Sequence, residues 1–380
     1  MNYFKVLFFL QHGDKSLFDI PVEVQRRFLD SLGEAKNDID RGFKQYLCQN
    51  LFVPKWKVLA FNIAAAIIMP FIVLLFLIKG CFLKKGAQID TMIERKGMDE
   101  VVPDIVMHKY HPESSFWNMG SSMSFHDLRF LIKLILRAPH YPYFVLKSWM
   151  NVVHYSDMIR RHSPKVMIQF GEFSFSSSIL TAYCHKYGIK HVDIMHGEKL
   201  YYIRDAFFHY DECYVWDEHY FKLFCELKAE PTQFIVALPE SIHINTKQHI
   251  NDAVYADYKY YLAATSEIEM KEIVESMQFA IRNGKKVKYR PHPRYTDMSL
   301  LRKYVKEEEI EDYKKVGILD SISNLEYAVG SYTTVLSQAF FSDKKVLLDD
   351  VTFKSEYEKL KGMKYILSSK NCPLLSEMQG

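Results

Sequence analysis

Two guanidinium groups and one imidazole lie within five consecutive residues of this chain. The segment Arg-Pro-His-Pro-Arg provides Arg290, His292 and Arg294, directly after a predicted strand. Its prolines restrict the backbone and remove amide donors, so the loop can adopt few conformations. Guanidinium forks match phosphate oxygens, and an imidazole can donate to a leaving phosphate. A rigid cationic cluster at a strand end has little structural purpose, so we interpret these residues as a phosphate site.

A set of hydroxyl groups precedes the helix that we predict over 334–341. The segment Gly-Ser-Tyr-Thr-Thr provides Ser331, Thr333 and Thr334 between a short strand and this helix. Hydroxyls and free amides at a helix N-terminus form an anion site. A threonine there can also cap the helix without any ligand, and the two roles are compatible. We predict that these hydroxyls contact the same phosphate as the arginine–histidine loop.

Two further residues could accept a proton from a substrate. His196 follows a predicted strand in Met-His-Gly-Glu, where Gly197 lets the backbone turn sharply and approach a ligand closely. Glu172 follows another strand in Gly-Glu-Phe, where a carboxylate could act as a general base. A histidine satisfied within a turn and a solvated loop glutamate are the alternatives without a function. The choice of base between Glu172 and His196 stays open.

Composition excludes several other classes of function. The net charge is +3, and this near-balance argues against a dedicated nucleic-acid binder, which needs a basic surplus. The six cysteines form no Cys-x-x-Cys pair, so the sequence predicts neither a zinc site nor a redox site. We expect no metal and no cofactor other than an activated substrate.

The elements that position these residues alternate between strands and helices. In the first part we predict a strand over 3–10, an irregular region over 86–120 and helices over 124–161. Strands over 165–170, 190–195, 213–216 and 234–238 then alternate with helices over 176–187 and 220–227. Such alternation indicates βαβ units and a parallel sheet.

The alternation restarts after a polar stretch. We predict strands over 258–264, 286–289, 316–319, 328–329 and 346–348, with helices over 267–283 and 334–341. A chain of 380 residues is too long for one ordinary core. The fold class we expect is therefore α/β with two Rossmann-like domains, 1–245 and 246–380, which face each other across a ligand-binding cleft.

One segment has the composition of a membrane helix. The run 58–78 contains 21 residues without a charge, which is long enough to cross a bilayer core. Trp56 has the position of an interfacial anchor, and lysines flank both ends: Lys55, Lys57, Lys79, Lys84 and Lys85. This symmetry suits a helix or hairpin that dips into one leaflet. A spanning helix and a buried core helix remain the alternatives.

Taken together, the motifs resemble those of GT-B transferases that use cytidine nucleotides. These include bacterial capsule polysialyltransferases, lipooligosaccharide sialyltransferases, Kdo transferases and teichoic-acid glycerophosphotransferases. The resemblance lies in an HG motif after a strand, an R-x-HP-x motif and an S-x-(S/T) motif before a helix, within 165–350. It is a pattern of motifs, not an alignment of the whole chain.

The resemblance implies roles for individual residues. In the sialyltransferase-like families, the HP histidine and the hydroxyl cluster contact the CMP phosphate, which implies this role for His292 and for Ser331, Thr333 and Thr334. An acidic residue of the first domain deprotonates the acceptor, which implies Glu172, although its surroundings depart from the acidic-acidic-glycine pattern. In the glycerophosphotransferases the HG histidine is the proposed base, and His196 matches it.

The activity implied by the resemblance is a metal-independent, inverting sugar transfer. The donor is a CMP-sugar, sialic-acid-like or Kdo-like, and the acceptor is a lipid-linked or oligosaccharide chain of the cell envelope. The expected location is the cytoplasmic face of the inner membrane, with the membrane surface as a partner. The alternatives are a CDP-glycerol or CDP-ribitol phosphotransferase, a UDP-sugar transferase or 2-epimerase, and a non-catalytic membrane scaffold for polysaccharide assembly.

Overall fold

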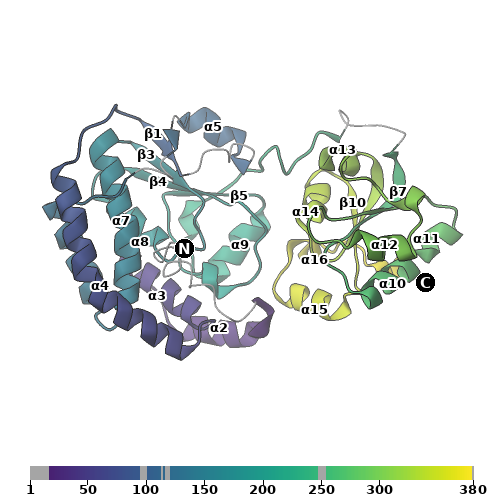
Figure 1. Ribbon diagram of the computed structural model, residues 1–380, viewed down its shortest axis with the longest axis horizontal. Helices are drawn as coiled ribbons and strands as arrows, with labels where there is room; N and C mark the ends of the chain where they lie inside the picture. Colours follow the sequence, from purple (N-terminus) through teal and green to yellow (C-terminus); the bar gives the residue numbers. More distant parts are fainter. Residues whose placement is uncertain (1–16, 95–100, 113, 116–119, 247–253, 379–380) are drawn as a thin grey trace. The chain divides into compact units, whose positions relative to one another are not determined.

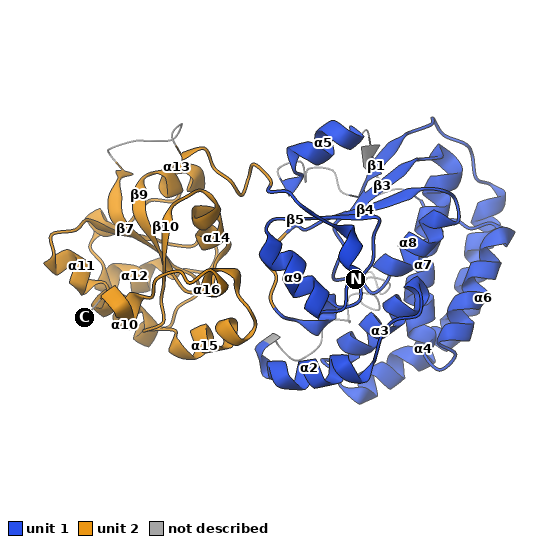
Figure 2. Ribbon diagram, turned by 180° about the vertical axis from the view of Figure 1, so that it is seen from behind, with its two compact units in different colours: residues 1–196, 201–238 blue, residues 197–200, 239–380 orange. Residues whose placement is uncertain are grey.

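The computed structural model describes residues 17–94, 101–112, 114–115, 120–246 and 254–378. The chain divides into two compact units: 1–196 with 201–238 is unit 1, and 197–200 with 239–380 is unit 2 (Figure 2). The predicted strand over 3–10 lies outside the described residues. The predicted domain boundary at 245 and the predicted cleft stay predictions.

Unit 1 contains a parallel sheet with the order β2-β1-β3-β4-β5-β6 in the described part of the chain. Its strands are β1 (Thr91–Ile93), β2 (Ser114–Ser115), β3 (Val166–Gln169), β4 (Lys190–Ile194), β5 (Glu212–Val215) and β6 (Phe234–Val236). The central strands are nearly continuous runs of buried residues, which is typical of a parallel sheet covered on both faces.

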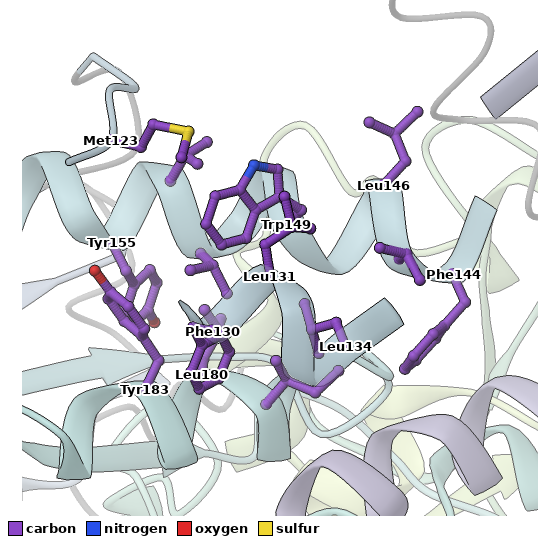
Figure 3. Packing of buried hydrophobic residues seen from close by; sticks show 14 of the residues in the cluster. Met123, Phe130, Leu131, Leu134, Phe144, Leu146, Trp149, Tyr155, Leu180 and Tyr183 are labelled. Atoms are coloured by element: carbon purple, nitrogen blue, oxygen red, sulfur yellow. The ribbon is translucent and has the colours of Figure 1, made fainter. Parts of the chain in front are cut away.

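The helices of unit 1 pack around this sheet and around each other. They are α2 (Val22–Ser31), α3 (Asp38–Asn50), α4 (Lys55–Cys81), α5 (Asp104–Tyr110), α6 (Leu128–Arg137), α7 (Pro142–His162), α8 (Ser177–His185) and α9 (Glu218–Glu226), with short 3-10 turns at Leu17–Asp19, Phe125–Asp127, Ile203–Asp205 and Pro231–Gln233. Helix α7 is the centre of this layer, because it packs against α4 and α8 (Figure 1) and also against α6 (Figure 2). Side chains of α6, α7 and α8 gather in one apolar cluster around Trp149 (Figure 3).

Unit 2 contains a second parallel sheet with the order β10-β9-β7-β8. Its strands are β7 (Ala256–Tyr261), β8 (Val287–Arg290), β9 (Leu325–Gly330) and β10 (Lys345–Leu348). Its helices are α10 (Glu267–Ser276), α11 (Gln278–Arg282), α12 (Met298–Tyr304), α13 (Ile318–Ser323), α14 (Thr334–Phe341), α15 (Lys354–Gly362) and α16 (Ile366–Ser369), with 3-10 turns at Glu307–Glu309 and Leu375–Met378. The alternation read from the sequence is confirmed as an α/β fold with two parallel sheets.

Two predicted regions are wrong. The region 86–120, predicted as irregular, contains the strands β1 and β2 and the helix α5. The two strands are only two or three residues long, so they give no periodic signal in the sequence. The segment 316–319, predicted as a strand, instead leads into α13. Gly317 is the N-cap of that helix, and Ile318 and Ile322 have the helical spacing of four residues, which outweighs the short apolar run.

Candidate active site

The arginine–histidine loop follows β8 at the carboxyl edge of the sheet of unit 2. The amide of His292 donates to Thr296 Oγ1 at 2.8 Å, and that hydroxyl donates to the carbonyl oxygen of Ala263 at 3.1 Å. Ala263 lies just after β7, the strand that pairs with β8. One hydrogen bond therefore joins two residues of the loop, and the other joins the loop to the segment after β7. Both restrict the loop, as its prolines predict.

The imidazole of His292 has a defined orientation. The backbone amide of Arg294 donates to His292 Nδ1 at 3.1 Å, and the ring stacks on Tyr295 with centroids 4.5 Å apart. An amide can only donate, so Nδ1 is the acceptor and the proton of the neutral ring is on Nε2. His292 is half-buried, and its Nε2 is thus a hydrogen-bond donor held by a stiff loop.

Arg290 does not present its guanidinium at the surface, contrary to the prediction for the loop. It is 7% exposed, and it donates to Glu311 Oε2 at 2.6 Å and to the carbonyl oxygen of Val316 at 2.9 Å. The same carboxylate accepts from the buried Lys259 at 2.6 Å. The physical reason is charge pairing, because an arginine at the end of a buried strand needs a carboxylate. Arg294 is exposed.

Glu311 keeps its charge in this buried group. Burial alone would raise its pKa, but Lys259, Ser321 and Arg290 outweigh burial and hold the pKa below the ordinary value. Burial also lowers the pKa of the Lys259 ammonium, with Glu311 acting in the opposite direction. Removal of Glu311 would leave two cations buried without their partner, so this residue supports the loop from inside the unit.

The hydroxyl cluster follows β9 at the same edge of the sheet. Thr333 caps α14, with its side chain accepting from the amide of Val335 at 3.4 Å, and Thr334 is the first helical residue. Ser331 and Thr333 are half-buried, and Thr334 is exposed. Strands β9 and β8 both pair with β7, so the two loops are separated by one strand, or about 10 Å at the usual strand spacing. The sheet therefore brings these two predicted motifs to one edge.

Two carboxyl groups near α14 were not predicted from the sequence. Glu198 Oε2 accepts from the hydroxyl of Ser337 at 2.7 Å. Residues 197–200 are part of unit 2, so this contact lies within that unit. Burial raises the pKa of Glu356, an effect that the nearby Ser331 hydroxyl partly offsets. Glu198 belongs to the Met-His-Gly-Glu motif, whereas no local pattern indicates a role for Glu356 in α15.

In unit 1 the structure brings together the two residues that the sequence left as alternative bases. Glu172 follows β3 and His196 follows β4, and these strands are parallel neighbours. Glu172 Oε1 lies 3.6 Å from His196 Nδ1. The carboxylate is fully buried, whereas the imidazole side chain is 27% exposed, with its Nδ1 atom buried. This is the arrangement of a histidine base with a carboxylate behind it.

Aromatic rings and a distant helix hold this pair in place. The rings of Phe170 and Phe173 lie edge-on to His196, with centroids 6.3 and 5.7 Å away. Gln45 of α3 donates to the backbone carbonyl of Glu172 at 2.9 Å, which fixes the turn after β3. Sequence reasoning could not find Gln45, because 127 residues separate it from Glu172.

The two glycines of these loops differ in what they require. A Cβ on Gly171 would lie 3.0 Å from Gln169 Nε2, and the amide of Gly171 donates to Asp193 at 2.8 Å, so the turn is crowded. Gly197 was predicted for a sharp turn, but its φ is not in the left-handed region, and a Cβ there would meet no atom within 4 Å. The protein itself therefore does not require glycine at 197.

The chain matches no known protein family and no curated protein sequence. Among solved structures it is similar to HepE of Anabaena in complex with UDP and glucose, with 6% identity, a TM-score of 0.37, and coverage of 77% of this chain and 97% of that one. It is similar to the wall teichoic acid polymerase TagF soaked with CDPG, with 7% identity, a TM-score of 0.40, and coverage of 77% and 79%.

It is also similar to the lipopolysaccharide outer core galactosyltransferase WaaB, with 12% identity, a TM-score of 0.40, and coverage of 78% of this chain and 94% of that one. A galactosyltransferase and a teichoic acid polymerase are thus among its structural neighbours. Likeness at this distance shows the fold alone.

Proposed function

We propose that the chain is a glycosyltransferase that transfers a sialic-acid-like or Kdo-like sugar from a CMP-sugar to an envelope polysaccharide or glycolipid. The observation that carries the proposal is the geometry of the His292 loop. The loop holds an imidazole Nε2–H donor and an exposed arginine at the same sheet edge as the hydroxyls and amides of the α14 N-terminus. Oriented donors and a helix N-terminus stabilise a phosphate on which charge grows.

On the nucleotide side, each predicted residue has a distinct part. Arg294, Ser331 and Thr333 bind the phosphate of the donor, with Thr334 at the helix start. His292 donates from Nε2 to a phosphate oxygen as CMP leaves. Arg290 orders the loop through Glu311 instead of binding the phosphate. The donors are protein groups throughout, so the proposed reaction needs no metal ion or other cofactor.

On the acceptor side, the His196–Glu172 pair acts as the base. His196 takes the proton from the acceptor hydroxyl, and Glu172, 3.6 Å from Nδ1, stabilises the imidazolium that forms. The acceptor oxygen forms a bond to the anomeric carbon as the bond to the CMP phosphate breaks, which inverts the configuration. Gly197 leaves open space next to the base, and we propose that the substrate approaches the backbone there.

A donor screen tests the proposal. Purified protein is incubated with CMP-, CDP- and UDP-activated compounds and an oligosaccharide acceptor, with and without EDTA, and nucleotide release is measured. We expect CMP release from a CMP-sugar, with equal rates in EDTA and a loss of at least 100-fold for His292→Ala on the usual scale of one transition-state donor. No release from any CMP-sugar would refute the assignment, and complete loss in EDTA would refute metal independence.

One observation favours a second function. This function shares the His196–Glu172 pair with the first, because the HG histidine is the proposed base of the glycerophosphotransferases and His196, 3.6 Å from Glu172, matches it. A CDP-glycerol or CDP-ribitol phosphotransferase would release CMP from those donors and form a phosphodiester. The same screen separates the two functions, because mass spectrometry of the product identifies either a glycoside or a phosphodiester.

A further inference from the structure

Helix α4 carries a continuous apolar stripe on its outer face. The exposed residues recur every three or four positions and are large: Leu59, Ile63, Ile67, Phe71, Leu74 and Ile78 are each at least half exposed. Only 17% of the most apolar 18-residue window of this helix is buried. A core helix would be mostly buried, so this helix is not part of an ordinary interior. An exposed stripe of this length marks an interaction surface.

The inner face of α4 is fixed to the folded unit near both ends. At the start, the amide of Tyr143 in α7 donates to Asn62 Oδ1 at 3.1 Å, and its ring stacks on Phe61. Toward the end, the amide of Met123 donates to the carbonyl of Phe76 at 3.1 Å. These contacts are 14 residues apart, or about 21 Å along a helix, so most of α4 lies along unit 1.

This attachment is incompatible with a helix that crosses a bilayer. Helix α7, which packs along α4, carries the ion pair of Asp157 with Arg161 at 2.5 Å and packs in turn on α8. If α4 crossed the hydrocarbon core, α7 and its ion pair would enter the core with it, and removing these charges from water would cost much free energy. Of the alternatives left open by the sequence, a helix in the plane of the membrane is the one that agrees with both the attached inner face and the exposed apolar outer face of α4.

Basic residues at both ends indicate what the stripe contacts. Lys55 and Lys57 lie in the first turn, where no acidic residue accompanies them and where cations oppose the helix dipole. Lys79 ends the stripe, and Lys84 and Lys85 follow it, exposed. Lys79 complements the dipole at the end of the helix, whereas Lys55 and Lys57 do not serve helix stability. Together the lysines suit anionic headgroups on either side of a buried apolar stripe.

A second helix on α7 has a similar outer face. Helix α6 exposes Ile132 and Leu136 on the same face as the basic residues Arg129 and Lys133, while Leu134 is fully buried. The side chain of Phe125, just before α6, is also exposed. Apolar and basic side chains interleaved on one exposed face are typical of helices that lie at a lipid interface.

We infer that α4 is a monotopic anchor, which lies in the plane of an anionic leaflet with Leu59 to Ile78 in the acyl boundary and lysines at both ends on headgroups. The leaflet is the cytoplasmic one, because its anionic lipids give it a negative surface potential that attracts basic segments. The anchor concerns where the protein acts, and it does not depend on which donor the protein uses.

Vesicle flotation of the full chain tests the anchor. We expect binding to vesicles containing phosphatidylglycerol, with weaker binding to pure phosphatidylcholine and weaker binding in high salt. The double variant Ile67→Glu with Phe71→Glu should bind at least tenfold more weakly. The matched control is Ile268→Glu, which changes an equally exposed residue, 72% exposed, on α10 of unit 2. Thermal unfolding of each variant establishes that it is folded.

Several outcomes would overturn the anchor. These are no flotation of the parent chain, equal binding of the double variant, or an equal loss in Ile268→Glu. A parent that stays off vesicles and forms a dimer, with the double variant monomeric, would assign the stripe to a second copy of this chain.

Side-specific labelling distinguishes a flat helix from a spanning one. Lys55→Cys and Lys84→Cys are made separately with the exposed Cys81 changed to Ser, and an impermeant maleimide is added outside sealed vesicles that carry the protein. Mass spectrometry of the labelled peptides identifies the site. We expect both positions to react from the side on which the protein was added, whereas protection of one end would show a spanning helix.

Discussion

Two histidines of this protein lie at strand ends in different units, and their Nδ1 atoms face opposite kinds of partner. In unit 2, His292 Nδ1 accepts from a backbone amide, so Nε2 carries the proton and can donate. In unit 1, His196 Nδ1 faces the Glu172 carboxylate, which favours a proton on Nδ1 and leaves a lone pair on Nε2. The neighbour of Nδ1 thus differs between the two rings, and this difference underlies the proposed roles of His292 as a hydrogen-bond donor and of His196 as a base.

The largest effect on activity is expected for substitutions of His196, the proposed base. Both His196→Ala and His196→Gln should lower kcat about 1000-fold, because neither side chain can accept a proton from a hydroxyl near neutral pH. The measurement is CMP release with the donor found in the screen, and unchanged thermal unfolding is the control for folding. If the glutamine variant kept more than about a tenth of the activity, His196 would not be the base.

A smaller effect, with a different pattern, is expected for substitutions of His292, the proposed hydrogen-bond donor to the phosphate. His292→Ala should lower kcat about 100-fold, as the loss of one transition-state hydrogen-bond donor does. His292→Gln should recover most of this loss, because its amide nitrogen can occupy a position near Nε2 and donate. The pair of glutamine variants therefore tests the comparison directly: glutamine restores activity at 292 and fails at 196. Equal behaviour at both sites would remove the distinction.

Glu172 should show an effect that is smaller again. Glu172→Gln keeps the shape of the buried side chain but removes the charge that stabilises the His196 imidazolium, so kcat should fall about 10- to 100-fold with little change in KM. In the His196→Ala background the same change should have almost no further effect, because the pair acts as one unit. Additive losses in the double variant would place Glu172 in an independent role.

A third histidine gives the smallest effect and serves as the structural reference. His191 is fully buried between Tyr155 and Thr181, and burial lowers its pKa to about 3. As pH falls below the ordinary value of 6.5, the unfolded chain binds a proton that the folded chain does not, so stability is lost over this window. The free energy of unfolding should fall by about 1 kcal/mol from this group between roughly pH 7 and pH 5.5.

Urea unfolding of the parent and of His191→Gln at several pH values measures this term. The glutamine variant has no proton to bind at 191, so the difference in unfolding free energy between the two proteins should change with pH in this window. A constant difference would show that His191 titrates alike in the folded and unfolded chains. Activity per folded molecule should stay near that of the parent, in contrast to the variants at 196 and 292.

The sequence predicted the parts of the fold that have local signals. The helix over 334–341 and a threonine cap at its start follow from two threonines before an apolar run, and both are found, with Thr333 as the cap. The strands before His196 and His292 are buried runs of ordinary length, so their carboxyl ends could be placed. What the sequence could not supply were partners from distant segments: Gln45 behind Glu172, and Glu311 opposite Arg290.

Arg290 shows why motif reading alone was insufficient. Two arginines flank the same Pro-His-Pro run, and their residue types give no sign that one is buried and the other exposed. A charge at the end of a buried strand requires a counter-charge, and Lys259 on the adjacent strand has the same need. Two cations on neighbouring buried strands could have pointed to a shared carboxylate, although not to which one.

The outward stripe of α4 has a consequence for the rate law of the protein. A protein held flat on a leaflet meets lipid-linked molecules by lateral diffusion, so the effective concentration of such a molecule depends on its density within the surface. Diluting the acceptor with inert lipid, at a fixed total amount, should therefore slow turnover, whereas diluting the whole vesicle suspension should leave turnover per bound protein unchanged.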